Sequence, residues 1–372
     1  MRPIVIAFLA AVAPAASAQQ SPAPTAATSA IVPAPAISAA EARQTATDLA
    51  QKLDEGYVFP DVAKRYAAML RANAASGAYD SIGSADRFAE RLTNDLSAVS
   101  ADAHLRVTLR DGQPMTHKAA AETHPKFPWK PIEEERWLAP GIAYIRFNVF
   151  PGDPDTVAEV TKFMKDHVTA KVIIFDNRTH HGGGLAEMNA MFPYLFSKST
   201  ALVDMDTRES VAERGEEPFV RKIPGIPGVV RREHYVEPDK TEKRLFKAKV
   251  FVLTSGATGS AAEHMTLSLK RTHRATIIGE PTAGAGHYGG EVDVGDRFQA
   301  FIPVGRTFDP DTGLGWEGTG VAPDVAVPAK DALTEALVRS GLTRADAERI
   351  NATVRPSGSM ERRIPRRLDA SR

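Results

Sequence analysis

Residues 250–271 read VFVLTSGATGSAAEHMTLSLKR, an apolar run followed by small residues and then a helical pattern. Val250–Leu253 is typical of a buried strand, and the small residues after it predict a tight turn. From Ser260 to Arg271 the apolar residues recur at helical spacing. The segment therefore predicts a strand, a turn and a helix, which is the unit of α/β domains with a parallel sheet.

The same unit recurs through the second half of the chain. Strands are predicted at 142–147, 172–175 and 276–278, and helices at 156–167 and from about Leu185. A charged stretch without a clear strand pattern, 204–247, interrupts the series. Strands and helices that alternate in this way predict an α/β fold class with a parallel sheet.

The first 110 residues differ in composition. Residues 1–18 have a charged start, a short apolar stretch and an Ala-Ser-Ala ending, which predicts a secretory signal peptide. Residues 19–37 are rich in Ala and Pro and predict a linker. Ser38 and Glu41 form a capping-box pattern, and the periodicity after them predicts a helical N-terminal domain over 38–110. We therefore expect an exported protein, periplasmic or secreted, with no membrane span after signal removal.

The composition excludes several kinds of chemistry. The 372 residues include no cysteine, which rules out disulfides, a thiol nucleophile, a zinc ribbon and an iron–sulfur cluster. The 46 basic and 46 acidic residues cancel, which argues against a nucleic-acid surface. Residues 336–372 are expected to form a basic, solvated tail, because eight Arg face four acidic residues from Thr343 onward.

The turn within 250–271 offers three candidate nucleophiles, Ser255, Thr258 and Ser260. Ser260 is expected at the helix N-terminus, where free N–H groups and the helix dipole stabilise developing negative charge. An ordinary helix cap is the competing interpretation of this position. An α/β-hydrolase is disfavoured, because Thr258 and Ala262 stand where that fold has glycines around its nucleophile.

A second candidate element is the glycine loop Asp176–Gly184, DNRTHHGGG, which follows a predicted strand. Successive glycines expose backbone N–H groups that suit either a phosphate or an oxyanion. A phosphate loop is disfavoured, because no Gly-Lys-Ser/Thr follows and the spacing of a dinucleotide-binding loop is missing. The loop is therefore a candidate oxyanion hole. Metal binding by His180 and His181 is a weaker alternative without an evident third ligand.

A serine nucleophile needs a base, and ten histidines are available. His104 is expected at the junction between the helical domain and a short strand, which is where a cleft would form. From spacing alone, a surface histidine is the simpler interpretation of His104. His264 lies one helical turn after Ser260 and is poorly placed to reach back to it. His234 lies in a polar, surface-like stretch.

Taken together, these segments resemble the family of C-terminal processing (tail-specific) serine peptidases, in particular the branch of the interphotoreceptor retinoid-binding protein and the tricorn core. The resemblance covers about 38–327 and rests on motifs that occur in the family's order. They are 57–61, 79–82 and 102–107, the Asp176–Gly184 loop, 253–263, and 315–324 (GWEGTGVAPD). The resemblance implies a crotonase-like ββα core with a parallel sheet over 111–335, preceded by the helical domain.

The resemblance also implies catalytic roles. Ser260 is similar to the family's nucleophile, His104 to its base, and Glu317 to the carboxylate that orients the base. Such an arrangement makes chemical sense, because serine is a poor nucleophile at neutral pH and the base needs an orienting partner.

The oxyanion hole that the resemblance implies combines the N–H of Ala261 with that of Gly183 or Gly184. Two features depart from the wider family. Ala285 stands where the other branch has a catalytic lysine, so a serine–lysine dyad is absent. The gap 110–140 is too short for the peptide-tethering PDZ domain of many relatives, so capture of substrate tails is not expected.

We therefore expect an exported serine-type peptidase that hydrolyses peptide or protein substrates through an acyl-enzyme, with no cofactor and no metal. The alternative is a non-catalytic protein that binds hydrophobic ligands on the same fold, as the retinoid-binding relative does. Fold alone does not separate the two. The presence of Ser260, His104 and Glu317 together favours the enzyme. The oligomeric state and the preferred cleavage position stay open.

Overall fold

The core of the computed structural model is a six-stranded sheet in the order β12-β9-β8-β4-β3-β2. The structure describes residues 35–102, 104–110, 130–212, 217–354, 356 and 358–362. The strands of this sheet are Ile132–Ala139 (β2), Ile142–Phe147 (β3), Val172–Asp176 (β4), Lys249–Thr254 (β8), Thr276–Gly279 (β9) and Val325–Ala326 (β12). β2 is antiparallel to β3, and the other neighbouring pairs are parallel. The predicted apolar strands and the parallel sheet are confirmed.

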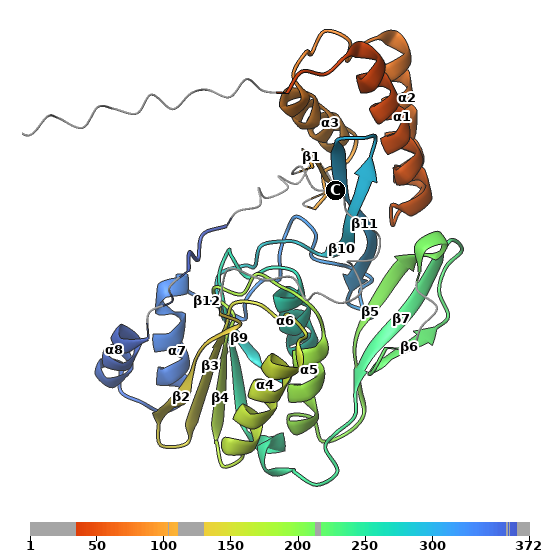
Figure 1. Ribbon diagram of the computed structural model, residues 1–372. Coiled ribbons are helices and arrows are strands. Elements are labelled where there is room, and N and C mark those ends of the chain that lie inside the picture. The colour runs from red at the N-terminus through yellow and green to blue at the C-terminus, as the bar shows by residue number, and fades with distance from the viewer. Residues whose placement is uncertain are drawn as a thin grey trace, which may run out of the picture. The chain divides into compact units, whose positions relative to one another are not determined.

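Helices cover both faces of this sheet (Figure 1). They are α4 (Pro154–Asp166), α5 (Ala186–Met191) and α6 (Ala261–Arg271) on one face, and α7 (Ala332–Arg339) and α8 (Arg344–Thr353) on the other. Ile145 and Phe175 pack with the first set, and Tyr144 and Ile174 with the second. Because β3, β4, β8 and β9 are buried on both faces, they are largely continuous apolar runs, whereas the edge strand β2 is charged and partly exposed.

A second sheet is antiparallel, with the path β1-β11-β5-β7-β6 and β10 paired to β11. Its strands are Arg106–Leu109 (β1), Thr200–Arg208 (β5), Val220–Ile223 (β6), Val229–Val236 (β7), His287–Val294 (β10) and Phe298–Phe308 (β11). The stretch 204–247 therefore contains strands that its charged sequence concealed. Its charges are accommodated because they pair across the sheet, as Arg231 does with Asp206 (Nε–Oδ1 2.7 Å). Short 3-10 turns lie at Phe192–Tyr194, Glu209–Val211, Arg244–Lys247 and Ala329–Asp331.

The predicted N-terminal helices are present as α1 (Ala39–Gly56), α2 (Pro60–Ser76) and α3 (Ala85–Val99). The Ser38 hydroxyl caps α1 by accepting a hydrogen bond from the Glu41 N–H (3.2 Å). Leu49 packs in one apolar cluster with Phe298 of β11. Ile37 belongs to the same cluster, so the predicted linker does not extend to 37. The predicted signal peptide and the linker up to residue 34 lie outside the described residues, as does the stretch from 111 to 129.

The C-terminal stretch from Thr343, expected to be solvated, is partly folded instead. α8 buries Ala347 in the cluster on the second face of the parallel sheet. Farther on, Arg362 donates hydrogen bonds to the carbonyl oxygens of Thr282 (2.7 Å) and Gly318 (3.0 Å). The abundance of arginine in this stretch concealed the apolar face of a helix.

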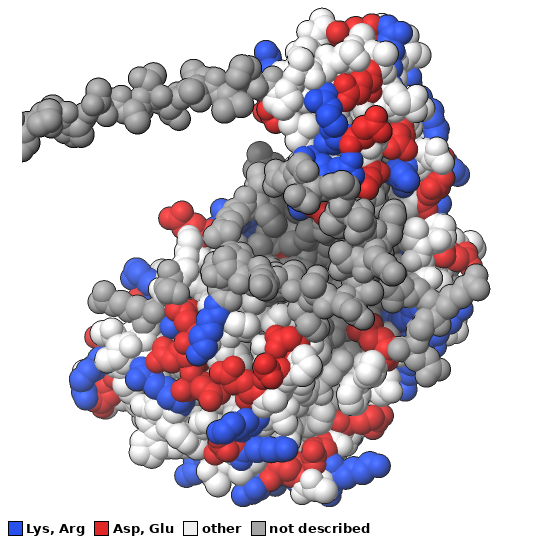
Figure 2. Space-filling view, in the orientation of Figure 1, with Lys and Arg blue, Asp and Glu red and all other residues white. Residues whose placement is uncertain are grey.

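The described surface carries charges of both signs. On the face shown in Figure 2, basic and acidic side chains are interspersed, in keeping with a formal net charge of zero. No helix within the described ranges is both long enough and apolar enough to cross a membrane.

A buried ion pair joins the end of β4 to the glycine loop. Arg178 donates to Asp176 through Nε (2.8 Å) and Nη2 (2.6 Å), and through Nη1 to the carbonyl oxygen of Ala329 (3.0 Å). The Tyr144 hydroxyl also donates to Asp176 (2.6 Å). Burial raises the pKa of Asp176, but the charge and hydrogen bonds of Arg178 outweigh it and hold that pKa below its usual value.

We expect Arg178→Ala to lower the free energy of unfolding by about 3–5 kcal/mol, because it leaves Asp176 buried and without its cation. Urea unfolding followed by circular dichroism measures the loss. The double variant Asp176→Leu/Arg178→Met is the matched control, since it removes both charges together and should cost less than Arg178→Ala alone. A single variant as stable as the wild type would contradict this account of the loop.

Candidate active site

Ser260 lies between β8 and α6 in a strained backbone conformation. Its φ of 54° and ψ of −118° are unusual for a residue with a side chain, and such strain concentrates at functional sites. It immediately precedes Ala261, the first residue of α6, so the predicted position at a helix N-terminus is confirmed. The N–H groups of Ala262, Glu263 and His264 already donate to backbone carbonyl oxygens, so among the described residues the N–H of Ala261 is the free donor of the first helical turn.

The other two hydroxyls of this turn have structural roles. Ser255 donates to the carbonyl oxygen of Arg178 (2.5 Å) and accepts from the Ala257 N–H (3.0 Å). Thr258 donates to the carbonyl oxygen of Asn177 (2.7 Å) and accepts from the Ser255 N–H (2.9 Å). Both side chains are fully buried. Ser260 is the one of the three that is not used to hold the two loops together.

Glu263, fully buried on the first turn of α6, fixes the loop around Ser260. Its Oε2 accepts from the N–H groups of Ser260 and Ala285 (both 2.8 Å). Its Oε1 accepts from the Thr282 hydroxyl and the Gly284 N–H (both 2.6 Å). Four donors thus converge on one carboxylate. Burial raises the pKa of Glu263 to about 7, although the four hydrogen bonds act in the opposite direction.

This raised pKa predicts that Glu263 makes folding pH-dependent. The folded protein holds the proton up to about pH 7, whereas the unfolded chain releases it near the ordinary value of 4.5. The contribution of Glu263 to the free energy of unfolding should therefore fall as the pH rises from about 4.5 to 7, by about 1.4 kcal/mol per unit of pKa difference.

We expect the stability difference between wild type and Glu263→Gln, measured by urea unfolding at pH 5 and pH 8, to be larger at pH 5. Gln carries no charge, so it lacks this pH dependence. Glu90→Gln, on the exposed side of α3, is the control and should leave the difference between the two pH values unchanged. A wild-type advantage that is equal at both pH values would contradict a raised pKa.

The glycine loop lies directly against Ser260. At Gly182 (φ 117°) an added Cβ would lie 2.7 Å from the Ser260 Cβ. At Gly183 (φ 128°) it would lie 1.9 Å from the Phe150 carbonyl oxygen. No side chain fits at either position, which explains the run of glycines. The loop is also held by His180, which is fully buried and accepts the Gly182 N–H at Nδ1 (3.1 Å).

The two glycines named as oxyanion donors differ in their hydrogen bonding. The Gly184 N–H donates to the Phe150 carbonyl oxygen (2.8 Å), so it is already occupied. Among the described residues, no acceptor bonds the N–H of Gly183 or of Ala261. The geometry therefore favours Gly183 and Ala261 as the pair of donors, and both line the same pocket as Ser260.

A cluster of one histidine and two carboxylates lies at the junction of the two sheets. His287, at the start of β10, lies 2.7 Å from Asp102 (Nδ1–Oδ2) and 3.9 Å from Glu317 (Nδ1–Oε2). Asp102 also accepts from the Tyr57 hydroxyl (2.9 Å). Glu317 accepts from the backbone N–H groups of Gly286 (2.6 Å) and His287 (3.0 Å). Both carboxylates are therefore fixed in place by donors from the chain.

His104 lies beside this cluster, two residues before β1. Its N–H donates to Asp102 (2.9 Å), and its ring stacks on Phe301 with centroids 5.4 Å apart. Burial lowers the pKa of His104, while the charges of Glu317 and Asp102 raise it. Its Nδ1 is buried with no partner among the described atoms. The predicted base and the predicted carboxylate are thus close enough to interact, at the junction where the sequence places His104.

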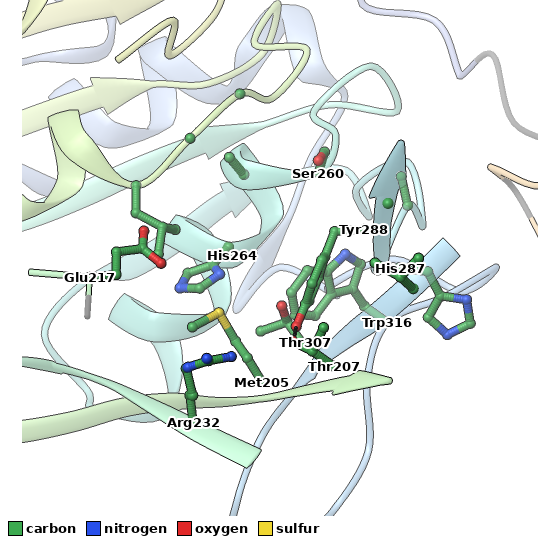
Figure 3. Close-up of a pocket in the computed structure, with 18 of the residues that line it drawn as sticks. Met205, Thr207, Glu217, Arg232, Ser260, His264, His287, Tyr288, Thr307 and Trp316 are labelled. Carbon is green, nitrogen blue, oxygen red and sulfur yellow. Dashed lines mark hydrogen bonds between the residues drawn. The ribbon is translucent and has the colours of Figure 1, made fainter. Parts of the chain in front are cut away.

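Ser260 opens into a pocket of about 550 Å³ between the two sheets (Figure 3). Its lining includes Gly183, Ser260, Ala261, His264, His287 and Trp316. In Figure 3 the ring of His287 points away from this pocket. Within the described ranges, no hydrogen bond joins the Ser260 hydroxyl to a histidine. Catalytic hydrogen bonds are often long or unformed in the free enzyme, so this geometry does not exclude a base.

Sequence reasoning missed His287 and misjudged His234. His287 follows the segment Gly284-Ala285-Gly286 and has no spacing motif with Asp102, which is 185 residues away. Only the pairing of β10 with β11 brings it to the cluster. His234 was placed in a surface-like stretch, but it is fully buried, because β7 packs it against α6.

A metal ion would find its best ligand set in the same cluster. The ligand atoms of Asp102, His287 and Glu317 lie within 4.8 Å of one another. The donor types suit a divalent transition metal, but Asp102 and His287 already satisfy each other through a hydrogen bond. His180 and His181 are not drawn into a group of three ligands among the residues that the structure describes.

Comparisons with known proteins bear on the fold and on the family of this chain. The model of peptidase family S41 matches residues 141–327, and that of the N-terminal domain of this family in eukaryotic IRBP matches 28–147. The fold is similar to the photosystem II D1 C-terminal processing protease, with 15% identity, a TM-score of 0.51, and coverage of 77% of this chain and 93% of that one. It is also similar to a lipoprotein from Streptococcus agalactiae, with 13% identity, a TM-score of 0.50, and coverage of 81% and 97%.

Proposed function

The chain belongs to peptidase family S41 and is a serine-type peptidase, and on this premise we propose that Ser260, His104 and Glu317 form its catalytic set. The observation that carries the proposal is the state of the Ser260 turn. Of its three hydroxyls, Ser260 alone does not bond the glycine loop. Its side chain takes part in the capping box with Glu263 at the start of α6, and it lines the same pocket as Gly183 and Ala261.

In the proposed reaction, the Ser260 hydroxyl oxygen attacks the carbonyl carbon of a peptide bond while His104 takes the hydroxyl proton. The negative charge that develops on the carbonyl oxygen is stabilised by the N–H groups of Gly183 and Ala261. His104 then gives its proton to the leaving amine, and an ester to Ser260 remains. Water, deprotonated by His104, hydrolyses this ester and restores the enzyme.

Glu317 would act by stabilising the charge on His104. Its carboxylate is anchored by two backbone N–H groups, and its charge raises the pKa of His104. Burial lowers the same pKa, so the imidazole stays neutral at neutral pH and is able to accept a proton. We also propose that the protein is exported, because residues 1–18 have the pattern of a cleaved signal peptide.

A fluorophosphonate probe tests the nucleophile directly. The purified protein should take up one equivalent of probe, and trypsin should release the adduct on the peptide 250–270, which contains Ser255, Thr258 and Ser260. Fragmentation by mass spectrometry should place the adduct on Ser260. An adduct on Ser255 or Thr258 would sink the assignment, and the absence of any adduct would favour the non-catalytic alternative, a hydrophobic-ligand carrier.

A further inference from the structure

Three side chains form a hydrogen-bonded chain behind the wall of the Ser260 pocket. His264, on α6, lines the pocket and contacts His234 of β7 (Nε2–Nδ1 2.8 Å). His234 in turn contacts Asn189 of α5 (Nε2–Oδ1 2.9 Å). His234 is fully buried and His264 almost so. The proposed mechanism uses none of the three.

The direction of these hydrogen bonds can be deduced from Asn189. Its Nδ2 donates to the Pro218 carbonyl oxygen (3.3 Å), so its Oδ1 is the atom that faces His234 and must accept. His234 therefore carries its proton on Nε2, which leaves a lone pair on Nδ1. That lone pair accepts from His264, so His264 carries its proton on Nε2.

The consequence is a fixed acceptor in the pocket wall. With its proton on Nε2, His264 has a lone pair on Nδ1, and no protein group among the described residues bonds that atom. Burial lowers the pKa of His234 to about 3 and lowers that of His264 well below its usual value. Both rings are therefore neutral at neutral pH, and the pattern of donors and acceptors persists.

The rest of the pocket lining has no formal excess of charge of either sign. Glu217 and Arg232 both line it, and their formal charges cancel. Figure 3 shows His264 between Ser260 and Met205. The candidate oxyanion donors, Gly183 and Ala261, lie on the same lining. A substrate whose carbonyl oxygen occupies that hole would place the adjoining side chain in this pocket.

We propose that the pocket takes the side chain on the acyl side of the cleaved bond and that His264 selects uncharged side chains ending in an N–H or O–H donor. Gln, Asn, Ser and Thr belong to this class. The choice of that peptide position rests on the proposed function, whereas the preference for a donor rests on the three side chains alone. An apolar side chain would leave the Nδ1 lone pair of His264 buried without a partner.

The test measures binding without hydrolysis. Two fluorescent peptides that differ only in Gln or Met at this position are titrated into the Ser260→Ala protein and followed by anisotropy. Met has nearly the shape of Gln but no N–H. We expect the Gln peptide to bind about tenfold more tightly, which is the net effect of one additional hydrogen bond. Equal affinities, or no binding of either peptide, would overturn the inference.

Two further variants separate recognition from packing. In the Ser260→Ala background, His264→Phe keeps an aromatic ring without the lone pair and should bring the Gln/Met ratio to about one. Asn189 does not line the pocket, so Asn189→Leu should act only by removing the hydrogen bond that orients the ring of His234. It should lower affinity for the Gln peptide and leave that for the Met peptide unchanged. An equal loss of affinity for both peptides would show that Asn189 has only a structural role.

The outcomes also distinguish this inference from the proposed function. If wild-type protein fails to cleave either peptide but Ser260→Ala prefers the Gln peptide, the inference stands and the proposed mechanism fails. If wild type cleaves both with equal kcat/KM and Ser260→Ala binds both alike, the mechanism stands and the inference is wrong.

Discussion

The Ser260→Ala protein should retain its fold and lose about six powers of ten in kcat. Removal of the catalytic serine of a comparable enzyme lowers kcat by about this factor, and the oxyanion hole alone supports only a small residual rate. Loss of the Ser260 hydroxyl should lower the free energy of unfolding by about 0.5–2 kcal/mol, the usual cost of a lost helix cap, because Glu263, Ser255 and Thr258 still hold the strained turn. A fluorogenic peptide that the wild type cleaves measures the rate.

Ser255→Ala is the matched control for Ser260→Ala. It removes a hydroxyl of the same turn that is fully buried and bonded at both ends. We expect it to lower the free energy of unfolding by about 1–3 kcal/mol, since the N–H of Ala257 and the carbonyl oxygen of Arg178 lose their partner. Its folded fraction should still react with a fluorophosphonate. If Ser255→Ala abolished labelling and Ser260→Ala did not, the nucleophile would be Ser255.

The parts of the fold that the sequence predicts well are those with a strong local signal. The strands β3, β4, β8 and β9 are buried on both faces and are therefore unbroken apolar runs. The three N-terminal helices show clear periodicity, and Ser38 supplies a cap. Ser260 could be located because a strand, a small-residue turn and a helix follow one another directly. In each case the deciding interactions lie within about twenty residues of the chain.

The parts that escaped prediction depend on contacts between distant residues. The strands of 204–247 are half exposed, and their charges pair only across the sheet, as in Arg231 with Asp206. His287 meets Asp102 only because β10 and β1 both pair with β11. Arg362 reaches the loop of Glu317 from the C-terminal stretch. None of these partners is visible from local periodicity.

Two histidines could serve as the base, His287 in the cluster and His104 beside it. His287 donates its Nδ1 proton to the Asp102 carboxylate, as the histidine of a serine peptidase triad does. Its ring nevertheless points away from the Ser260 pocket. His104 has no such carboxylate bond at Nδ1, but it is half-buried and interacts with Glu317. Separate substitution of His104 and of His287 decides between them.

We expect His104→Ala to lower kcat by about 10³–10⁴-fold, close to the upper limit for removal of a general base. His287→Ala should lower it by about tenfold at most, because that ring only holds Asp102 and the start of β10. Added imidazole should restore part of the rate of His104→Ala and none of that of His287→Ala, since a small base replaces a missing proton acceptor but not a missing packing contact.

The pH profile gives an independent test of the same assignment. The base must be neutral to accept a proton, so kcat/KM falls at low pH, where His104 becomes protonated. We call this fall the acid limb of the profile. Because burial lowers the pKa of His104, the acid limb should lie below the ordinary histidine value of 6.5. The charge of Glu317 raises the pKa of His104, so Glu317→Gln should move the acid limb to still lower pH while it reduces kcat. Two results together would assign the role of base to His287. The acid limb would stay at the same pH in Glu317→Gln, and His287→Ala would lose more kcat than His104→Ala.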